Sequence, residues 1–364
     1  MSQLANDCEA LNLSQGFPDF SAPQALLDRV SHHLNAGRNQ YAPMSGVPEL
    51  RQEIARKTHA LYGRRVDPDT EITVTSGATE GLFSAIETFV ASGDEVIMFD
   101  PAYDSYEPAV TLAGGRSIHI PLRAPDFNVD WNRVADMIND ATSMIILNTP
   151  HNPTGAAFDS GDMATLADIV RDTNILLLGD EVYEHIIFDG RTHQSLHRVD
   201  ELAQRSLVIS SFGKTYHMTG WKIGYCVAPA KLTAEFRKVH QFVQFCVATP
   251  LQYAISDYLA SSAEHYSNLP AFYQEKRDSF CQLIRESRFE YRPSAGTYFQ
   301  LADYSAISRD PDTEFAKWLT TEHGVACIPV SVFYAQPPDQ HLVRFCFAKD
   351  PRTLEQAAER LCRI

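Results

Sequence analysis

Short runs rich in β-branched residues alternate with amphipathic stretches between about residue 71 and residue 228. The runs read EITVTS, DEVIMFD, RSIHIPL, SMIILNTP, NILLLGD, SLVISS and KIGYCVA. Between them lie stretches such as EGLFSAIETFV and DMATLADIVRD, which have the spacing of helices with one apolar face. Continuous apolar strands are typical of a sheet that is covered on both faces. This part of the chain therefore predicts an α/β domain with a mostly parallel sheet.

The pattern changes after about residue 258. A long helical segment, HYSNLPAFYQEKRDSFCQLIRES, leads into the short strands GTYFQLADY, ACIPVS and LVRFCFA and a last helix, TLEQAAERL. This pattern predicts a smaller α+β domain. The first forty residues carry one helix and the segment LSQGFPDF, and we expect them to pack with it. The predicted division is a large domain over 41–258 and a small domain formed by 1–40 and 259–364.

Composition and charge narrow the class of protein. The 364 residues are 44% hydrophobic and 21% charged, as in ordinary soluble proteins, and the formal net charge is -15. Binding to nucleic acid or to an anionic membrane needs a basic surface, so neither is expected. No apolar run is long enough to span a bilayer, and no signal-peptide pattern opens the chain, so we expect a cytoplasmic protein. The 7 scattered cysteines and 13 histidines show no disulfide or metal-binding spacing, and we expect no metal.

Polar side chains follow the predicted strands at the edge where ligands bind in such sheets. The residues at these points are Gly77, Ala78 and Thr79 at a helix start, Asn148 and Asn152 after SMIIL, Asp180 and Tyr183 after NILLLG, and Ser211 and Lys214 after SLVI. They supply an anion cradle at a helix N-terminus, an amide, a carboxylate, a phenol and an amine. A site for pyridoxal 5'-phosphate (PLP) requires this set of groups.

The chemistry of PLP explains each residue type. A lysine amine forms an imine with the cofactor aldehyde, and once released it is the base that moves the α-proton of an amino acid. A carboxylate keeps the pyridine nitrogen protonated, so that the ring accepts electrons from the substrate. A phenol and an amide donate to the phenolate oxygen of the cofactor and lower the pKa of the imine.

Five stretches, YAPMSGVPELR, SGATEG, NTPHNPTG, DEVY and SSFGKTYHMTGWKIGY, occur in this order along the chain. Together they resemble the class I and II aminotransferases of PLP fold type I, and most closely the branch of kynurenine and bacterial methionine aminotransferases. The resemblance runs from about Asn12 to the C-terminus. It implies an enzyme that moves the α-amino group of methionine and aromatic amino acids to a 2-oxo acid, while the cofactor alternates between its aldehyde and amine forms.

The resemblance also implies a role for each matching residue at the cofactor. Lys214 matches the lysine that forms the imine. The phosphate is bound by Ser211, Lys222, Gly77, Ala78 and Thr79, and Tyr103 stacks on the ring. Asp180 matches the carboxylate at the ring nitrogen, and Asn152 and Tyr183 match the donors to the phenolate oxygen. Lys214, Asp180 and Tyr183 are the expected catalytic residues.

Further residues match the substrate site and the dimer. Arg344 matches the arginine that binds the substrate α-carboxylate, Gly16 lies where the N-terminal segment folds over it, and Phe17 lies near the substrate side chain. Tyr41 matches a tyrosine that reaches the phosphate from the other subunit, which implies a homodimer with shared sites. The side-chain pocket is expected to include Phe245 of the partner subunit, with Phe242 as the competing match.

Two other functions stay open at this point. A PLP-dependent C–S lyase would use every cofactor residue named above and would differ in the fate of the substrate electrons. The alternative that is not an enzyme is a regulatory domain that binds PLP. The preferred amino donor, among methionine, aromatic amino acids, histidine and kynurenine, and the preferred acceptor are not determined by the sequence. The segment VHQFVQFCVATP holds no arginine, so aspartate is expected to be a poor donor unless Arg288 or Arg292 reaches the pocket.

Overall fold

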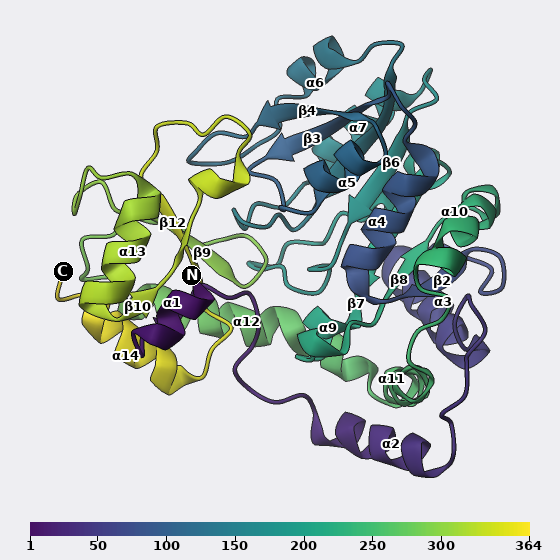
Figure 1. The fold of residues 1–364 in the computed structure, drawn as a ribbon, viewed down its shortest axis with the longest axis horizontal. Helices are drawn as coiled ribbons and strands as arrows, with labels where there is room; N and C mark the ends of the chain where they lie inside the picture. Colours follow the sequence, from purple (N-terminus) through teal and green to yellow (C-terminus); the bar gives the residue numbers. More distant parts are fainter.

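A seven-stranded sheet forms the centre of the protein, whose computed structural model describes residues 1–364 (Figure 1). The strand order is β2-β8-β7-β6-β5-β3-β4, and β8 is the one strand antiparallel to its neighbours. The strands are β2 (Ile72–Thr75), β3 (Glu95–Asp100), β4 (Arg116–Pro121), β5 (Thr142–Asn148), β6 (Leu176–Asp180), β7 (Ser206–Ser211) and β8 (Gly224–Val227). The predicted α/β domain with a mostly parallel sheet is thereby confirmed.

Helices cover both faces of this sheet, which explains why its strands are apolar throughout. Successive side chains of a strand point to opposite faces. In β3, Val96 and Met98 join the core under α4 (Gly77–Phe89), α5 (Tyr106–Leu112) and α10 (Ala230–Val243). Ile97 and Phe99 join the core under α6 (Trp131–Met137) and α7 (Ser160–Val170) on the other face. Both sets must be apolar because neither face meets water.

A smaller α+β unit lies beside the large sheet (Figure 1). Its three-stranded antiparallel sheet has the order β11 (Ile328–Pro329), β12 (Leu342–Cys346) and β9 (Phe299–Asp303). Helices α12 (Ala263–Leu283), α13 (Asp312–His323) and α14 (Pro351–Leu361) pack around it. The N-terminus joins this unit, since β1 (Leu11–Asn12) pairs in parallel with β10 (Val325–Ala326) and α1 (Ser2–Asp7) contacts α13.

The rest of the N-terminal segment goes elsewhere. Helix α2 (Gln24–Asn35) packs against α11 (Thr249–Ser261), away from the small unit, and α11 also contacts α3 (Pro48–Tyr62) (Figure 1). The division into 41–258 and 1–40 with 259–364 stays a prediction. We propose that the boundary near the N-terminus precedes α2.

The remaining helical elements are one turn long and lie near the ends of strands. They are α8 (Asp200–Ala203), α9 (Phe212–Thr215), η1 (Leu196–Arg198), η2 (Thr219–Trp221) and η3 (Ser331–Phe333). No helix combines the length and the apolar character that crossing a bilayer requires.

Candidate active site

A cavity opens at the carboxyl ends of β5, β6 and β7, with about 700 Å³ of empty space that is partly open to solvent. Most of the residues predicted for cofactor binding line it together: Gly77, Ala78, Thr79, Tyr103, Asn152, Asp180, Tyr183, Ser211, Lys214 and Lys222. Leu82, Asn148, Val182 and Thr219 complete the lining. Separate strand ends thus converge on one space, as the parallel sheet requires.

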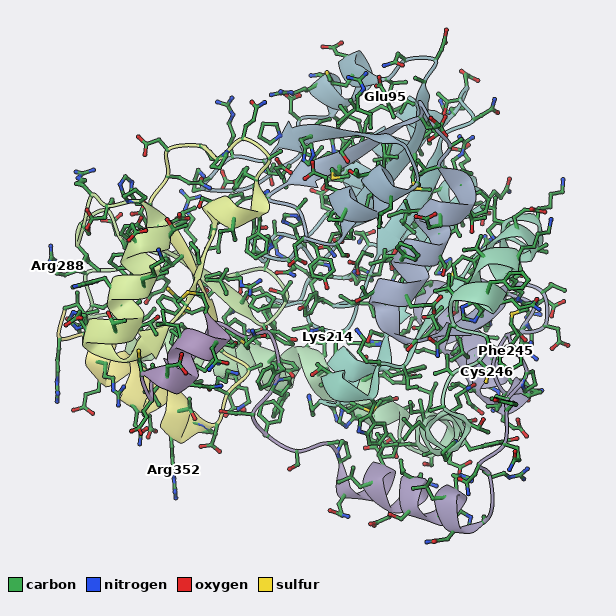
Figure 2. The ribbon with its side chains drawn as sticks, viewed as in Figure 1. Glu95, Lys214, Phe245, Cys246, Arg288 and Arg352 are labelled. Atoms are coloured by element: carbon green, nitrogen blue, oxygen red, sulfur yellow. The ribbon has the colours of Figure 1, made fainter.

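Lys214 is placed by the sharp transition from β7 into α9. Ser211 ends the strand and caps the short helix, because its hydroxyl accepts a hydrogen bond from the backbone N–H of Gly213 at 3.2 Å. The next residue is Lys214, which lies in the middle of the protein between the large and small sheets (Figure 2). Its amine donates to the hydroxyl of Tyr298 at 2.7 Å and to the carbonyl of Gly16 at 3.1 Å.

The surroundings of Lys214 favour its neutral form. Burial lowers the pKa of the amine from 10.5 to about 8, and Arg344 adds to the effect, whereas Cys346 and Asp180 oppose it. A neutral amine has a free lone pair, which both nucleophilic attack and proton abstraction require. The site therefore holds an amine that is reactive near neutral pH.

Asp180 ends β6 and is almost fully buried. Burial raises the pKa of its carboxyl from 3.8 to about 6. A hydrogen bond of 2.5 Å from the Tyr106 hydroxyl acts in the opposite direction and lowers this pKa. The backbone N–H of Val182 gives a longer bond to the other oxygen, at 3.4 Å. A buried carboxylate that is ionised at neutral pH is a suitable partner for a protonated ring nitrogen.

The opposite end of the cavity is suited to a phosphate. The first backbone N–H groups of α4 have no partner within the helix, and the helix dipole adds positive potential there. Gly77 opens this helix at φ +71, and a Cβ at this position would lie 3.1 Å from Cε of Lys222. A larger residue would therefore be strained and would crowd Lys222, whose amine lies 3.4 Å from Oγ1 of Thr79.

A buried hydrogen-bond network holds Glu184, the residue that follows Tyr183 in the chain. The carboxylate of Glu184 accepts hydrogen bonds from Lys57 at 2.6 Å, from Ser210 at 2.5 Å and from Tyr62 at 2.5 Å. Burial alone raises the pKa of Glu184, but Lys57 and the other donors hold it well below its usual range. Burial also raises the pKa of Tyr183, so its phenol stays protonated and can donate to an anionic oxygen.

Arg344 lies in β12 and reaches the cavity from the small sheet. Its Nη1 donates to Oδ1 of Asn152 at 2.7 Å and its Nη2 to the carbonyl of Ser14 at 3.2 Å, and the guanidinium lies 3.9 Å from the ring centre of Phe299. Its Nε is buried and has no partner. An arginine with an unsatisfied buried N–H is suited to binding a carboxylate. Because Arg344 occupies the amide oxygen of Asn152, the amide nitrogen remains the group that can donate.

Gly16 and Phe17 differ in how far they take part in the site. Gly16 contacts Lys214 directly, and a Cβ at this position would approach Cζ of Phe299 to 2.7 Å. Phe17 is 42% exposed and does not line the cavity. Lys349 holds it, by donating to the Phe17 carbonyl at 2.9 Å and by placing its amine 4.6 Å from the ring centre.

Tyr41, Phe245 and Phe242 lie outside the cavity of their own chain. Their side chains are exposed, by 82%, 49% and 86%, and the rings of Tyr41 and Phe245 meet edge to face at 5.2 Å. Figure 2 shows Phe245 at the opposite side of the large domain from the small domain, well away from Lys214. Exposed aromatic side chains in a group are typical of a surface that contacts another chain.

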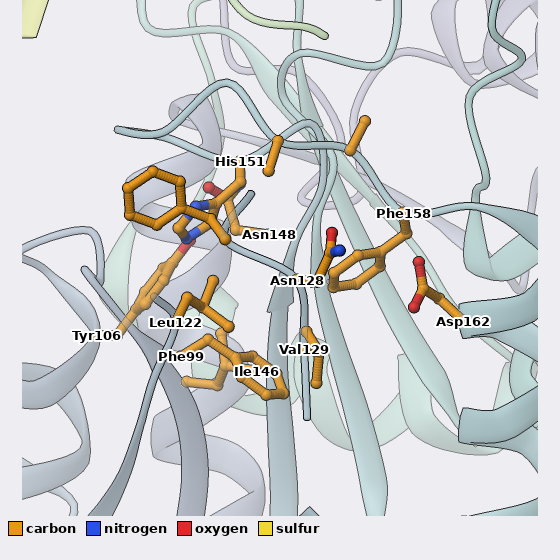
Figure 3. A pocket seen from close by; sticks show the side chains of 13 residues that line it. Phe99, Tyr106, Leu122, Asn128, Val129, Ile146, Asn148, His151, Phe158 and Asp162 are labelled. Carbon is orange, nitrogen blue, oxygen red and sulfur yellow. The ribbon is translucent and has the colours of Figure 1, made fainter. Parts of the chain in front are cut away.

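A second, narrow cavity shares Asn148 with the first and is also lined by Tyr106 (Figure 3). Its lining is mostly apolar and includes Phe99, Leu122, Val129, Ile146 and Phe158. His151 also faces it, and burial lowers the pKa of this histidine to about 4, so that the ring is neutral. The Tyr106 ring belongs to this apolar space, whereas its hydroxyl bonds to Asp180 on the cofactor side.

Tyr106 and Tyr298 bond to Asp180 and Lys214, and the sequence did not indicate either tyrosine. Tyr106 lies three positions after Tyr103 in the stretch YDSY and opens α5, and this proximity was the available signal. Tyr298 stands just before β9 in the stretch GTYFQLADY, where a core tyrosine is the ordinary interpretation. Only the folded chain brings its hydroxyl to Lys214.

The comparisons with known proteins agree with this geometry. The family model described as aminotransferase class I and II matches residues 9–361. The chain is 53% identical over 361 residues to a methionine aminotransferase of Escherichia coli, covering 99% of this chain and 94% of that protein. It is 33% identical to kynurenine–oxoglutarate transaminase 1 of Mus musculus, covering 99% and 93%. The crystal structure of YbdL from Escherichia coli, which identifies a methionine aminotransferase function, superimposes with a TM-score of 0.98 at 52% identity, covering 100% and 95% of the two chains.

Proposed function

Because the chain belongs to the class I and II aminotransferases and is a PLP-dependent transaminase, we propose that it transfers the α-amino group of methionine and of aromatic amino acids to a 2-oxo acid. Family membership confirms the predicted enzyme and cofactor over the alternative of a regulatory domain. The observation that carries the choice of donor is that the cavity lining includes no arginine, and that Arg344, which bonds to Asn152 of that lining, is assigned to the α-carboxylate and leaves none for a second carboxylate.

The residues present fit the cofactor, which supplies an aldehyde for the substrate amine and a ring that accepts electrons from the substrate Cα. Lys214 would hold the aldehyde end, Asp180 would pair with the ring nitrogen, and Tyr183 and Asn152 would donate to the ring oxygen. The N-terminus of α4, with Ser211 and Lys222, would bind the phosphate. Tyr103 would supply an aromatic contact to the ring.

Binding of the substrate follows from Arg344. A bidentate bond from its guanidinium to the α-carboxylate fixes the amino acid with its Cα toward Lys214, and this geometry is one that lysine cannot reproduce. Lys214, as a neutral amine, then takes the proton from Cα and returns it to the cofactor side. The net result would be transfer of the α-amino group from the donor, which leaves as its 2-oxo acid, to a second 2-oxo acid.

Two arginines that could bind a distal carboxylate lie elsewhere. Arg292 pairs with Asp126 at 2.6 Å, and Arg288 bonds to the carbonyl of Ala306 on the outer side of the small domain (Figure 2). A second carboxylate in the side-chain pocket would therefore lose water without gaining a partner. This arrangement supports apolar and sulfur-containing donors over aspartate.

The homodimer and the cytoplasmic location remain predictions. The exposed pair of Tyr41 and Phe245 supports the first, because both residues are expected to reach a site and neither lines the site of its own chain. We propose that they complete the cavity of the partner subunit, where Tyr41 approaches the phosphate and Phe245 the substrate side chain. Phe242 stays the competing match for the second role.

A survey of single half-reactions tests the proposed function. The PLP-loaded enzyme is mixed with one amino acid at a time, without an acceptor, and the absorbance of the cofactor is followed. We expect rapid conversion of the aldehyde form to the amine form with L-methionine, L-phenylalanine and L-tyrosine, and slow conversion with L-aspartate. Absence of conversion with all of the first three would contradict the proposal.

The same mixtures separate the transferase from the C–S lyase. A transferase without acceptor stops after one equivalent of 2-oxo acid per site, because its cofactor has become the amine form. A lyase given cystathionine returns its cofactor unchanged and continues to release ammonia and a thiol. Continued release over many equivalents, without formation of the amine form, would favour the lyase.

A further inference from the structure

The buried hydroxyl of Tyr298 joins the catalytic amine to the N-terminal segment. Lys214 Nζ donates to Tyr298 Oη at 2.7 Å, the Tyr298 hydroxyl donates to the carbonyl of Gly16 at 2.5 Å, and Lys214 Nζ also reaches that carbonyl at 3.1 Å. The three polar atoms form a closed triangle that contains side chains from α9 and the start of β9 and the backbone of the segment before α2.

The number of protons fixes the direction of each bond. A carbonyl can only accept, so Tyr298 donates its single phenol proton to the carbonyl of Gly16. The lone pairs of the Tyr298 oxygen are then free to accept a hydrogen bond from Lys214. A neutral amine has two N–H groups and one lone pair. Because the oxygens of Tyr298 and Gly16 lie only 2.5 Å from each other, one N–H of Lys214 points between them and is shared by both, and the second N–H and the lone pair take directions away from both acceptors, toward the cavity.

The Tyr298 side chain has little freedom to leave this position. It is completely buried, and its ring meets those of Tyr183 at 5.1 Å, Phe299 at 4.9 Å and Tyr273 at 5.8 Å. The Gly16 carbonyl is held as well, because Lys349 donates to the carbonyl of the next residue, Phe17, at 2.9 Å. Both acceptors of the Lys214 amine are thus rigid.

We propose that Tyr298 is a positioning residue for Lys214, whose hydroxyl aims the lone pair of the free amine at the substrate Cα. The proposal rests on the proposed function, in which the Lys214 amine is released by the substrate and moves its proton. The ammonium formed by that step keeps one N–H between the same two acceptors, so the N–H that carries the transferred proton stays on the cavity side. Tyr298 acts through Lys214, whose amine it contacts.

The test compares Tyr298→Phe with Tyr273→Phe. Each variant removes one buried phenol hydroxyl and keeps the ring, but the Tyr273 hydroxyl bonds to Nδ1 of His217 at 3.0 Å and does not reach Lys214. The first readout needs no cofactor. Reductive methylation of Lys214 in the cofactor-free protein is followed against pH by mass spectrometry of the peptide that contains it.

We expect the midpoint of this profile to fall by about one pH unit in Tyr298→Phe and to stay unchanged in Tyr273→Phe, because an acceptor within hydrogen-bond distance stabilises the ammonium form. The second readout is turnover of the PLP-loaded enzyme with L-methionine and with its Cα-deuterated form. In Tyr298→Phe, kcat should fall about 10- to 100-fold with a larger deuterium isotope effect, the range of a general-base contribution, while KM changes little.

An unchanged midpoint in Tyr298→Phe overturns the proposal, and so does an equal shift in Tyr273→Phe, which would mean that packing alone is responsible. If Tyr298→Phe does not fold, Tyr298→Met provides the same comparison, because methionine fills an irregular apolar space without a hydroxyl. A different result would show that the proposed function is wrong: the wild-type protein would not transaminate any amino acid. The methylation profiles would still show whether Tyr298 acts on Lys214.

Discussion

The phenol of Tyr106 donates a hydrogen bond of 2.5 Å to the carboxylate of Asp180, and both groups are buried. This bond stabilises the ionised carboxylate, whose pKa burial has already raised to about 6. Tyr106→Phe should therefore raise the pKa of Asp180 further. We expect kcat/KM for L-methionine to fall about 3- to 4-fold near pH 6.5 and to approach a 10-fold loss at about pH 5, as a lost bond to a charged group of about 1.5 kcal/mol implies, and to recover at pH 8.5.

A matched control for this prediction is Tyr334→Phe. It removes another buried hydroxyl, which bonds to the carbonyl of Leu122 at 3.2 Å and has no contact with Asp180. Its profile of kcat/KM against pH should follow that of the wild type. A loss in Tyr106→Phe that is the same at every pH would show that the hydroxyl does not act through the ionisation of Asp180.

Asp180 should lower the stability of the cofactor-free protein at neutral pH. The folded state holds the Asp180 proton more tightly than the unfolded state, because the folded pKa of about 6 exceeds the ordinary value of 3.8. The contribution of Asp180 to stability is thus fully present below pH 3.8 and is lost as the pH rises through 6. Asp180→Asn should be more stable than the wild type by on the order of 3 kcal/mol at pH 8, the equivalent of a shift of about two units.

Urea unfolding of both cofactor-free proteins at pH 4 and pH 8 measures this difference. The gap between the two midpoints should widen with pH, and Asp180→Asn should lose most of its turnover once PLP is added. Equal midpoints at pH 8 would mean that water or another charge already compensates the buried carboxylate.

Substitution of each of the two lysines in the stretch SSFGKTYHMTGWK should impair a different property of the enzyme. Lys214→Ala removes both the covalent link and the base, and we expect turnover to fall by at least about 10³-fold while PLP still binds. Lys222→Ala removes a charge at the phosphate end, and the dissociation constant for PLP should rise about 10- to 100-fold, the scale of one charge-assisted bond. Lys231→Ala, at an exposed position, is the control. Measurements of kcat and of PLP binding separate the two roles, and near-normal turnover in Lys214→Ala would refute its assignment.

The choice of substrate can be measured as a ratio. With one fixed 2-oxo acid, kcat/KM for L-methionine and L-phenylalanine should exceed that for L-aspartate by about 100-fold or more, since an unpaired carboxylate costs about 3 kcal/mol or more in a dry pocket. Sulfur and aromatic rings gain additional contacts in an aromatic pocket. A value for aspartate equal to that for methionine would show that an arginine from one of the two chains reaches the side chain.

Assembly can be tested at Tyr41. Sedimentation should find a homodimer of the wild-type protein, and Tyr41→Ala should weaken PLP binding without changing the fold of the monomer, because this side chain is exposed in the single chain. Mixing Tyr41→Ala with Lys214→Ala then provides a complementation test. Restored activity in the mixed dimer, about one quarter of that of the wild type for random pairing of equal amounts, would mean that one subunit supplies Tyr41 to the Lys214 of the other. Full activity of a monomer would contradict the prediction.

The sequence predicted the large sheet and most of the cavity because both depend on local pattern and on chain order. Runs buried on two faces are apolar throughout, and parallel strands bring the residues that follow them to one edge, so Asn152, Asp180 and Lys214 were expected to converge. Tyr298 was not predicted, because its partner Gly16 is 282 positions away and a buried tyrosine looks the same in sequence whatever its hydroxyl contacts. The packing of α2 against α11 could not be predicted for a related reason, since an amphipathic helix shows that it has an apolar face but not which surface covers that face.

The pairing of β1 with β10 sets an order of events during synthesis. Leu11 pairs with Val325, and the Ser14 carbonyl accepts from Arg344, so these N-terminal residues leave the ribosome more than 300 residues before their partners. The large sheet is complete once β8 has been made, and domains generally fold as units during translation. A nascent chain can therefore build the phosphate end of the cavity while its first residues remain without a partner. The ability to discriminate among amino acids is the last property that the chain acquires.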